Sequence, residues 1–196
     1  MKAVFCDING VLFEQEVRFS EKYCHDFGLK MEVMNEFFDG AFDLCLTGKA
    51  DLKEELVKLT EKWRWKGSVE KLIEYWFESG AKPHYKLMDY LAGLRAAGIK
   101  LYLSTQNEKY QTANFIKKLK PLMKYDGVIT TCEVGYKKSN PKFFGEALKI
   151  TGVKAENAIV IDNNQKAIAA AELCGIKTVF FENESQSIAA LGAILE

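Results

Sequence analysis

The sequence predicts an α/β protein in which a doubly wound parallel sheet carries an inserted, all-helical segment. Five short runs are apolar on both faces, as strands covered by helices on two sides must be. Helical patterns alternate with these runs over residues 84–181, which indicates right-handed βαβ units. Residues 14–82 contain no clear strand run and have helical patterns, so we expect them to form an insertion after the first strand.

The strands and helices of the sheet region follow from these patterns. Strands are expected at residues 3–6, 101–103, 127–130, 158–161 and 178–181. Helices are expected at residues 85–97, 141–150 and 165–174. A glycine stands just beyond each helix, at Gly98, Gly152 and Gly175, where a left-handed backbone ends the helix at low cost.

The inserted segment is expected to contain helices at residues 21–27, 32–42, 51–65 and 68–79. Asp51 and Glu54 have the spacing of a capping box, and Pro83 marks the return to the sheet. We therefore divide the chain into a core, residues 1–13 and 83–196, and a helical insertion, residues 14–82. The insertion is rich in aromatic residues, most of which should form its own core; Trp63 and Trp65 lie on different helix faces, so one of them could face a ligand.

Composition excludes several classes of function. The 196 residues contain 27 Lys plus Arg and 27 Asp plus Glu, so the net charge is zero and no basic field favours nucleic acid. The longest uncharged stretch, residues 185–195, is too short to cross a membrane. The five cysteines are scattered and form no CxxC motif, which predicts reduced thiols in a cytoplasmic protein rather than a disulfide framework or zinc site.

Polar side chains follow three of the expected strands directly. Asp7 follows the first strand, Ser104 and Thr105 follow the second, and Asp162 follows the fourth. Because the carboxyl ends of parallel strands face the ligand crevice, we expect these side chains to converge there. Taken singly, each aspartate has a plainer interpretation: Asp7 caps the turn at Asn9, and Asp162 caps the next helix.

Four motifs in register give the chain a resemblance to a known family. They are Asp7-Ile8-Asn9-Gly10-Val11, then Ser104 at the end of a strand, then Lys138 within GYKKSNP at residues 135–141, then Asp162-Asn163. Over its whole length the chain resembles the haloacid dehalogenase-like hydrolases, and more narrowly the subgroup with a helical cap. The resemblance implies a Rossmann-like core and a cap at residues 14–82.

The resemblance also implies roles for the motif residues. Asp7 would attack phosphorus and form an aspartyl-phosphate, a covalent mechanism in two steps. Ser104, Thr105 and Lys138 would bind the phosphoryl group, with Lys138 neutralising its charge. Mg²⁺ would be the cofactor, since it prefers oxygen ligands. Its ligands would be Asp7, the carbonyl oxygen of Asn9, Asp162 and Asn163.

Two positions depart from the family pattern. Phosphatases of the family usually carry an aspartate two residues after the nucleophile, where it acts as general acid and base, but this chain has Asn9. An amide cannot transfer that proton, and general acid–base catalysis is typically a factor of about 10²–10⁴ in rate. Asn163 stands where many relatives have a second acid, so the metal site would carry less negative charge.

Three functions remain open, and we favour the first. It is slow, Mg²⁺-dependent hydrolysis of a small phosphorylated metabolite. The second is a catalytically impaired binding or scaffold protein with the same fold. The third is a metal-independent dehalogenase-like hydrolase, in which Arg18 or Arg64 of the cap binds the substrate carboxylate. We expect neither nucleic acid nor a membrane as partner, and a homodimer formed through the cap or a sheet edge stays open.

Overall fold

The computed structural model describes residues 1–15, 17–78 and 81–195 of the chain. Its central sheet has five parallel strands in the order β5-β4-β1-β6-β7. The strands are β1 (Ala3–Cys6), β4 (Lys100–Thr105), β5 (Gly127–Thr130), β6 (Ala158–Asp162) and β7 (Lys177–Phe180). The α/β fold class and all five predicted strand positions are confirmed. β1 lies in the middle, so the residue after it lies between the ends of β4 and β6.

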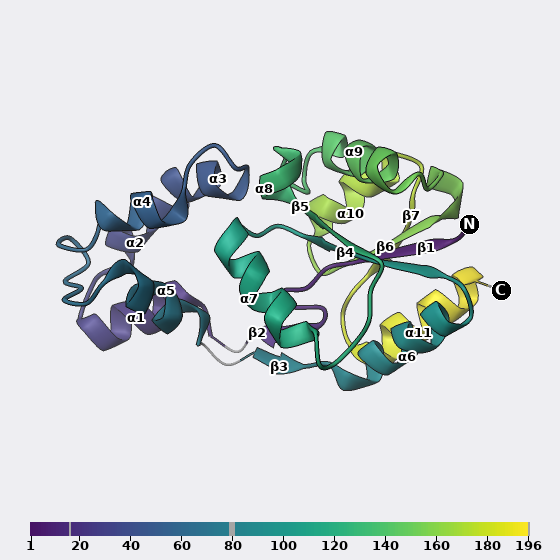
Figure 1. Cartoon of the computed structure of the whole chain (residues 1–196), viewed down its shortest axis with the longest axis horizontal. Coiled ribbons are helices and arrows are strands. Elements are labelled where there is room, and N and C mark those ends of the chain that lie inside the picture. The colour runs from purple at the N-terminus through teal and green to yellow at the C-terminus, as the bar shows by residue number, and fades with distance from the viewer. Residues whose placement is uncertain (16, 79–80, 196) are drawn as a thin grey trace.

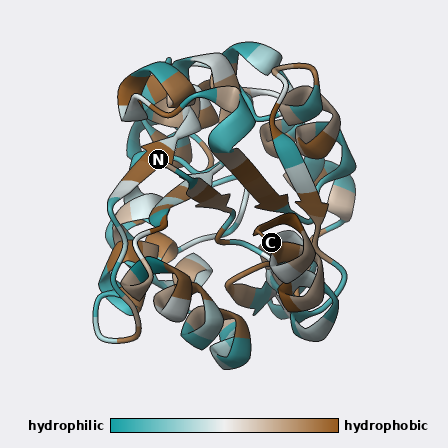
Figure 2. Cartoon of the chain, turned by 90° about the vertical axis from the view of Figure 1, so that its right-hand side faces the viewer, coloured by the Kyte–Doolittle hydropathy of each residue, from teal (hydrophilic) through white to brown (hydrophobic). Residues whose placement is uncertain are grey.

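Helices cover both faces of this sheet (Figures 1 and 2). One face packs against α6 (Tyr85–Ala96), α7 (Lys109–Leu119) and α11 (Glu184–Leu195). The other face packs against α9 (Pro141–Thr151) and α10 (Gln165–Glu172). The short helix α8 (Thr131–Val134) and a loop precede α9. Successive residues of β1 alternate between the two apolar cores: Val4 and Cys6 join one, while Ala3 and Phe5 join the other. The sequence analysis did not predict α7, α8 or α11.

The described residues of the inserted segment form five helices, which lie to the left of the core in Figure 1. They are α1 (Phe19–Phe27), α2 (Met31–Phe38), α3 (Ala41–Leu46), α4 (Leu52–Val57) and α5 (Val69–Phe77). We call this segment the cap. Its aromatic core includes the buried residues Phe37, Trp63 and Trp76.

Two expected cap helices are shorter than predicted. The helix expected at residues 32–42 is broken at Gly40, whose φ of −128° and ψ of −99° are not helical. The helix expected at 51–65 ends at Val57, and Arg64 has a left-handed φ of 58°. The helix expected at 68–79 is observed as α5, and Ser79 lies outside the described residues. Trp63 is fully buried and Trp65 is half-buried with its Nε1 donating to the carbonyl oxygen of Ser68, so Trp63 does not face a ligand.

A short antiparallel ribbon connects the cap to the core. β2 (Phe13–Gln15) pairs with β3 (Ala81–Pro83), with Phe13 opposite Pro83 and Gln15 opposite Ala81. The sequence analysis predicted no strand here, because each strand has only three residues and Pro83 is atypical of a strand. The boundaries expected near residues 13 and 83 fall within this ribbon.

Cap and core also contact each other away from the ribbon. Asp51 begins α4 by accepting hydrogen bonds from the amides of Lys53 at 2.8 Å and Glu54 at 3.4 Å, as the N-cap half of a capping box. The same carboxylate accepts a hydrogen bond from the hydroxyl of Tyr110 on α7 at 3.0 Å and pairs with Lys109 at 2.5 Å. Asp51 thus joins the first turn of a cap helix to a core helix.

None of the helices in the described part of the chain is both long and apolar enough to cross a membrane. All five cysteines are free thiols, and Cys6, Cys24 and Cys45 are buried, as expected.

Candidate active site

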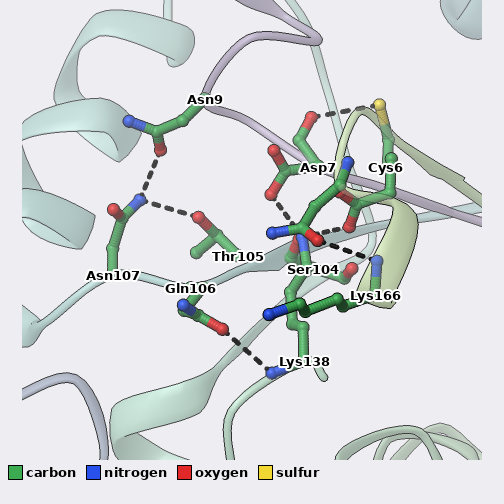
Figure 3. A network of polar contacts seen from close by, with 11 residues as sticks. Cys6, Asp7, Asn9, Ser104, Thr105, Gln106, Asn107, Lys138 and Lys166 are labelled. Atoms are coloured by element: carbon green, nitrogen blue, oxygen red, sulfur yellow. Dashed lines mark hydrogen bonds and ion pairs between the residues drawn. The ribbon is translucent and has the colours of Figure 1, made fainter. Parts of the chain in front are cut away.

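Two aspartates and a lysine meet at the carboxyl end of the sheet. Figure 3 shows one of these aspartates, Asp7, beside Lys138. Asp7 follows β1, and Asp162 ends the neighbouring strand β6; both are buried. Lys138 reaches them from the loop between α8 and α9, and its Nζ contacts Asp7 Oδ1 and lies 2.6 Å from Asp162 Oδ2. The same Nζ donates to the backbone carbonyl oxygen of Ser104 at 2.9 Å. Residues 7, 104, 138 and 162 therefore converge, although they are far apart in the sequence.

The charges of this cluster depend on one another. Burial raises the pKa of Asp7 from 3.8 to about 7; Lys138 opposes this rise, and Asp162 adds to it. Burial alone would lower the pKa of Lys138, but the carboxylates of Asp7 and Asp162 outweigh it and raise that pKa above its usual value. The ammonium group is therefore held in its charged form, and it is the counter-charge that favours an ionised Asp7.

Ser104 and Thr105 end β4 beside this cluster, and their hydroxyl groups are used differently. The Oγ of Ser104 is fully buried and has no hydrogen-bond partner among the described residues. The Oγ1 of Thr105 instead accepts a hydrogen bond from Nδ2 of Asn107 at 2.7 Å. Ser104 is thus the free hydroxyl of the pair.

Asn9 is held by its side-chain oxygen. Nδ2 of the buried Asn107 donates to Asn9 Oδ1 at 2.7 Å as well as to Thr105 (Figure 3). This leaves Nδ2 of Asn9 as a hydrogen-bond donor. The loop after Asn9 packs closely on Asn163, because a Cβ at Gly10 would lie only 2.1 Å from Asn163 Nδ2 and the φ of Gly10 is +81°.

These side chains line one small cavity, which we call the polar hollow. It has a volume of about 150 Å³ and is lined by Asp7, Asn9, Gln106, Lys138, Asp162, Asn163, Asn164 and Ala167. Neither Ser104 nor Thr105 is among its lining residues. Asp162 also contacts the start of the next helix. Its Oδ1 accepts a hydrogen bond from the amide of Asn164, the N-cap of α10, at 2.8 Å.

The donor chemistry of the polar hollow suits a hard cation such as Mg²⁺. The residues that line it include two carboxylates, Asp7 and Asp162, and also Asn9 and Asn163, which could offer the backbone carbonyl oxygen and the side-chain oxygen, respectively. Among the described residues no group of three or more His, Cys, Asp or Glu side chains could hold a metal ion, so neutral oxygens would have to complete the coordination. Asp7, Asp162 and Lys138 together carry a formal charge of −1, which predicts modest affinity.

A second cavity of about 450 Å³ lies between the cap and the core, and we call it the cap chamber. Asn9 and Gln106 line both this chamber and the polar hollow, so the two spaces adjoin. Arg18 lines the chamber. Arg64 is exposed and lines neither of these two cavities.

The sequence analysis assigned no role to Gln106 or Asn107. Gln106 Oε1 accepts a hydrogen bond from the amide of Lys138 at 3.1 Å, and Asn107 orients Asn9 as described above. Both residues directly follow the carboxyl end of β4, so their position was the available signal.

Comparisons with known proteins agree with this fold. Residues 1–175 match the haloacid dehalogenase-like hydrolase family. No curated protein matches the chain. Among solved structures, a predicted HAD-like family hydrolase from Porphyromonas gingivalis has a TM-score of 0.79 and 20% identity, covering 100% of this chain and 98% of that one. A HAD family enzyme from Bacteroides thetaiotaomicron, in complex with magnesium and inorganic phosphate, has a TM-score of 0.78 and 20% identity, covering 93% and 95%.

An L-2-haloacid dehalogenase is also similar, with a TM-score of 0.64 and 15% identity, covering 95% of this chain and 87% of that one. At these identities the structures show a common fold and not a common substrate. The sequence match over residues 1–175, together with this fold, assigns the protein: the chain belongs to the haloacid dehalogenase-like hydrolases.

Proposed function

We propose that the protein is a slow, Mg²⁺-dependent phosphatase of a small phosphorylated metabolite. The observation that carries this proposal is the buried cluster of Asp7, Lys138 and Asp162 beside the free hydroxyl of Ser104. A carboxylate nucleophile, a fixed cation and a free hydrogen-bond donor are the groups that transfer of a phosphoryl anion needs.

In the first step, a carboxylate oxygen of Asp7 attacks phosphorus, and the bond from phosphorus to the alcohol oxygen breaks. Lys138 and the Ser104 hydroxyl stabilise the negative charge on the phosphoryl oxygens. The departing alkoxide takes its proton from water, because Asn9 has no acidic proton to give. In the second step, water attacks phosphorus and the bond to the Asp7 oxygen breaks. The attacking water loses its proton to the solvent, inorganic phosphate is released, and the Asp7 carboxylate is regenerated.

Asp7, Asp162, Asn163 and the backbone carbonyl oxygen of Asn9 would hold Mg²⁺, which when bound would further neutralise the phosphoryl oxygens. Asn9 restricts the rate of both steps, because each requires a proton transfer that an amide cannot perform. The proposed slowness of the enzyme follows from this substitution.

Hydrolysis of phosphate esters, with and without Mg²⁺, tests the proposal. We expect turnover in the wild-type protein and its complete loss in Asp7→Ala and in the near-isosteric Asp7→Asn, with circular dichroism confirming the fold. Asp89→Asn, at an exposed carboxylate of α6, is the matched control and should retain full activity. Turnover that persists without Asp7 would remove it as nucleophile, and an inactive wild-type protein would favour the binding or scaffold function.

The dehalogenase-like reaction is the second candidate, and one observation favours it. Arg18 lines the cap chamber, where it could bind a substrate carboxylate, and a halide leaves without the proton that Asn9 cannot supply. Release of halide from 2-haloacids in the presence of a metal chelator would support this reaction and overturn the phosphatase.

A further inference from the structure

The cap chamber has an uneven distribution of polar and aromatic groups. On the core side, it is lined by the amides of Asn9, Gln106 and Gln111, next to the polar hollow. On the cap side, the rings of Phe38, Phe42 and Trp76 line it together with polar side chains that include Ser20 and Asn35. A molecule with one end in the polar hollow would therefore contact the neutral amide groups near that end and the aromatic rings at its other end.

The three rings of the cap side form one wall. Their centroids are 5.3 Å apart for Phe38 and Phe42, 5.5 Å for Phe38 and Trp76, and 5.4 Å for Phe42 and Trp76. Phe38 and Phe42 are only half-buried, unlike the neighbouring Phe37, which lies within the cap core. The break at Gly40 separates the helices that carry Phe38 and Phe42, α2 and α3.

The charge of the chamber is balanced. Arg18 and Asp39 are its charged lining residues in the described part of the chain; both are exposed, and their formal charges cancel. The chamber thus offers no unbalanced counter-charge to a leaving group with a net charge. A planar apolar group, in contrast, would bury its faces against the aromatic rings of the chamber.

From this arrangement, and resting on the phosphatase function proposed above, we infer that the substrate is a phosphate monoester whose leaving group is uncharged and ends in a planar, apolar ring. The phosphate would occupy the polar hollow, the ester linkage would lie near Asn9 and Gln106, and the ring would lie against Phe42 and Trp76. Phe38 and Phe42 are then specificity-determining residues that take no part in the chemistry.

Three esters of primary alcohols test this inference, because their leaving groups are all alkoxides: ethyl phosphate, 2-phenylethyl phosphate and 2-carboxyethyl phosphate. We expect kcat/KM to be roughly tenfold or more higher for the phenyl-bearing ester than for ethyl phosphate, with the carboxylate-bearing ester no better than ethyl phosphate. Equal use of the first two, or preference for the carboxylate, would overturn the inference while leaving the phosphatase function intact.

Variants separate the chamber from the rest of the cap. Phe42→Leu should reduce the preference for 2-phenylethyl over ethyl phosphate about threefold or more. Phe27→Leu is the matched control, since Phe27 is a half-buried cap ring that stacks on Tyr23 at 4.3 Å and does not line the chamber. The same change in both variants would contradict a specific role for Phe42.

A binding measurement tests the inference even if no ester turns over, in which case the phosphatase function itself fails. The esters are then titrated into the wild-type protein in the presence of Mg²⁺, and tryptophan fluorescence is recorded. Tighter binding of 2-phenylethyl phosphate than of ethyl phosphate would support the chamber as the site of the ring. Equal affinities would overturn it.

Discussion

At the scale of single residues, Lys138 determines the charge balance of the site. Its Nζ contacts both buried carboxylates and the carbonyl oxygen of Ser104, so it is paired on three sides. Removing this ammonium would leave two buried carboxylates close together. Their electrostatic repulsion would favour the protonation of one of them. Lys138 therefore maintains the ionised nucleophile as well as neutralising the substrate.

Asn9 gives the most direct prediction at this scale. We expect Asn9→Asp to raise phosphatase turnover tenfold or more, because the new carboxylate supplies a general acid and base. General acid–base catalysis typically increases a rate by a factor of about 10²–10⁴. Asn107 already donates to the side-chain oxygen at position 9, so the new carboxylate should keep this orientation. Steady-state kinetics with phosphate esters checks the gain.

Two controls accompany this substitution. Asn35→Asp makes the same chemical change at an exposed residue of the cap chamber and should leave kcat unaltered. Since an Asn-Gly sequence deamidates readily, mass spectrometry of the peptide containing residue 9 must show intact asparagine in the wild-type sample. No increase in turnover for Asn9→Asp would contradict the slow-phosphatase proposal.

The sequence predicted part of this residue-level arrangement. Asp7, Ser104 and Asp162 follow apolar strand patterns, so their meeting at one sheet edge could be expected from the fold class. Lys138 was found through its motif alone, since a loop position carries no periodic signal. The role of Asn107 could not be predicted, because it depends on where a loop after β4 places a side chain relative to the loop after β1.

At the scale of elements, Asp126 joins α6 to the start of β4 through the loop before β5. Its carboxylate accepts hydrogen bonds from Arg95 Nε at 3.0 Å, Lys100 Nζ at 2.9 Å and the amide of Leu101 at 3.0 Å. Burial alone would raise the pKa of Asp126, but the Leu101 amide and the two cations outweigh it and lower the pKa from 3.8 to about 2. The ionised form therefore stabilises the fold.

The pH dependence of stability follows from the sign of this shift. Because the pKa of Asp126 is lower in the folded than in the unfolded state, its contribution is present above about pH 4 and is lost as the pH falls toward 2. We expect Asp126→Asn to lower the free energy of unfolding by about 1–2 kcal/mol at pH 7. Urea denaturation at several pH values, with Asp89→Asn as control, measures this effect. An equal loss at pH 7 and pH 2 would contradict it.

Strand positions were easier to predict from the sequence than helix ends. The strands β1 and β6 are buried on both faces, so apolar runs mark them clearly. The cap helices are amphipathic over longer stretches, and their apolar pattern continues past Gly40, where the backbone leaves the helical conformation. The pattern at residues 51–65 likewise continues beyond Val57, because Leu59 and Trp63 still face the cap core.

At the scale of the whole molecule, polar contacts outside the cap chamber hold the cap against the core. Tyr110 donates to Asp51, Lys137 pairs with Asp43, and Lys118 donates to the carbonyl oxygen of Phe77 at 3.0 Å. Each contact joins a core residue to a cap residue. The position of the cap, and so the shape of the chamber, depends on these polar contacts as well as on the β2–β3 ribbon.

Tyr110→Phe tests this dependence. We expect KM for phosphate esters to rise about twofold to fivefold with little change in kcat, because one hydrogen bond between the cap and the core is lost. Tyr75→Phe is the matched control, since it removes a tyrosine–aspartate hydrogen bond to Asp26 that lies entirely within the cap. A similar rise in KM for both variants would mean that the Tyr110 contact has no special part in cap closure.

The pairing of β2 with β3 has a consequence for how such proteins diversify. Gln15 and Ala81 face each other in register, so the polypeptide leaves the sheet domain and re-enters it at adjacent points. An inserted segment whose two ends lie side by side can be lengthened, shortened or replaced by another segment without disturbing the packing of the sheet. Exchanging the helices between these two residues for those of a homologous chain should therefore transfer the substrate selectivity of that chain, while the nucleophile and its lysine stay in place.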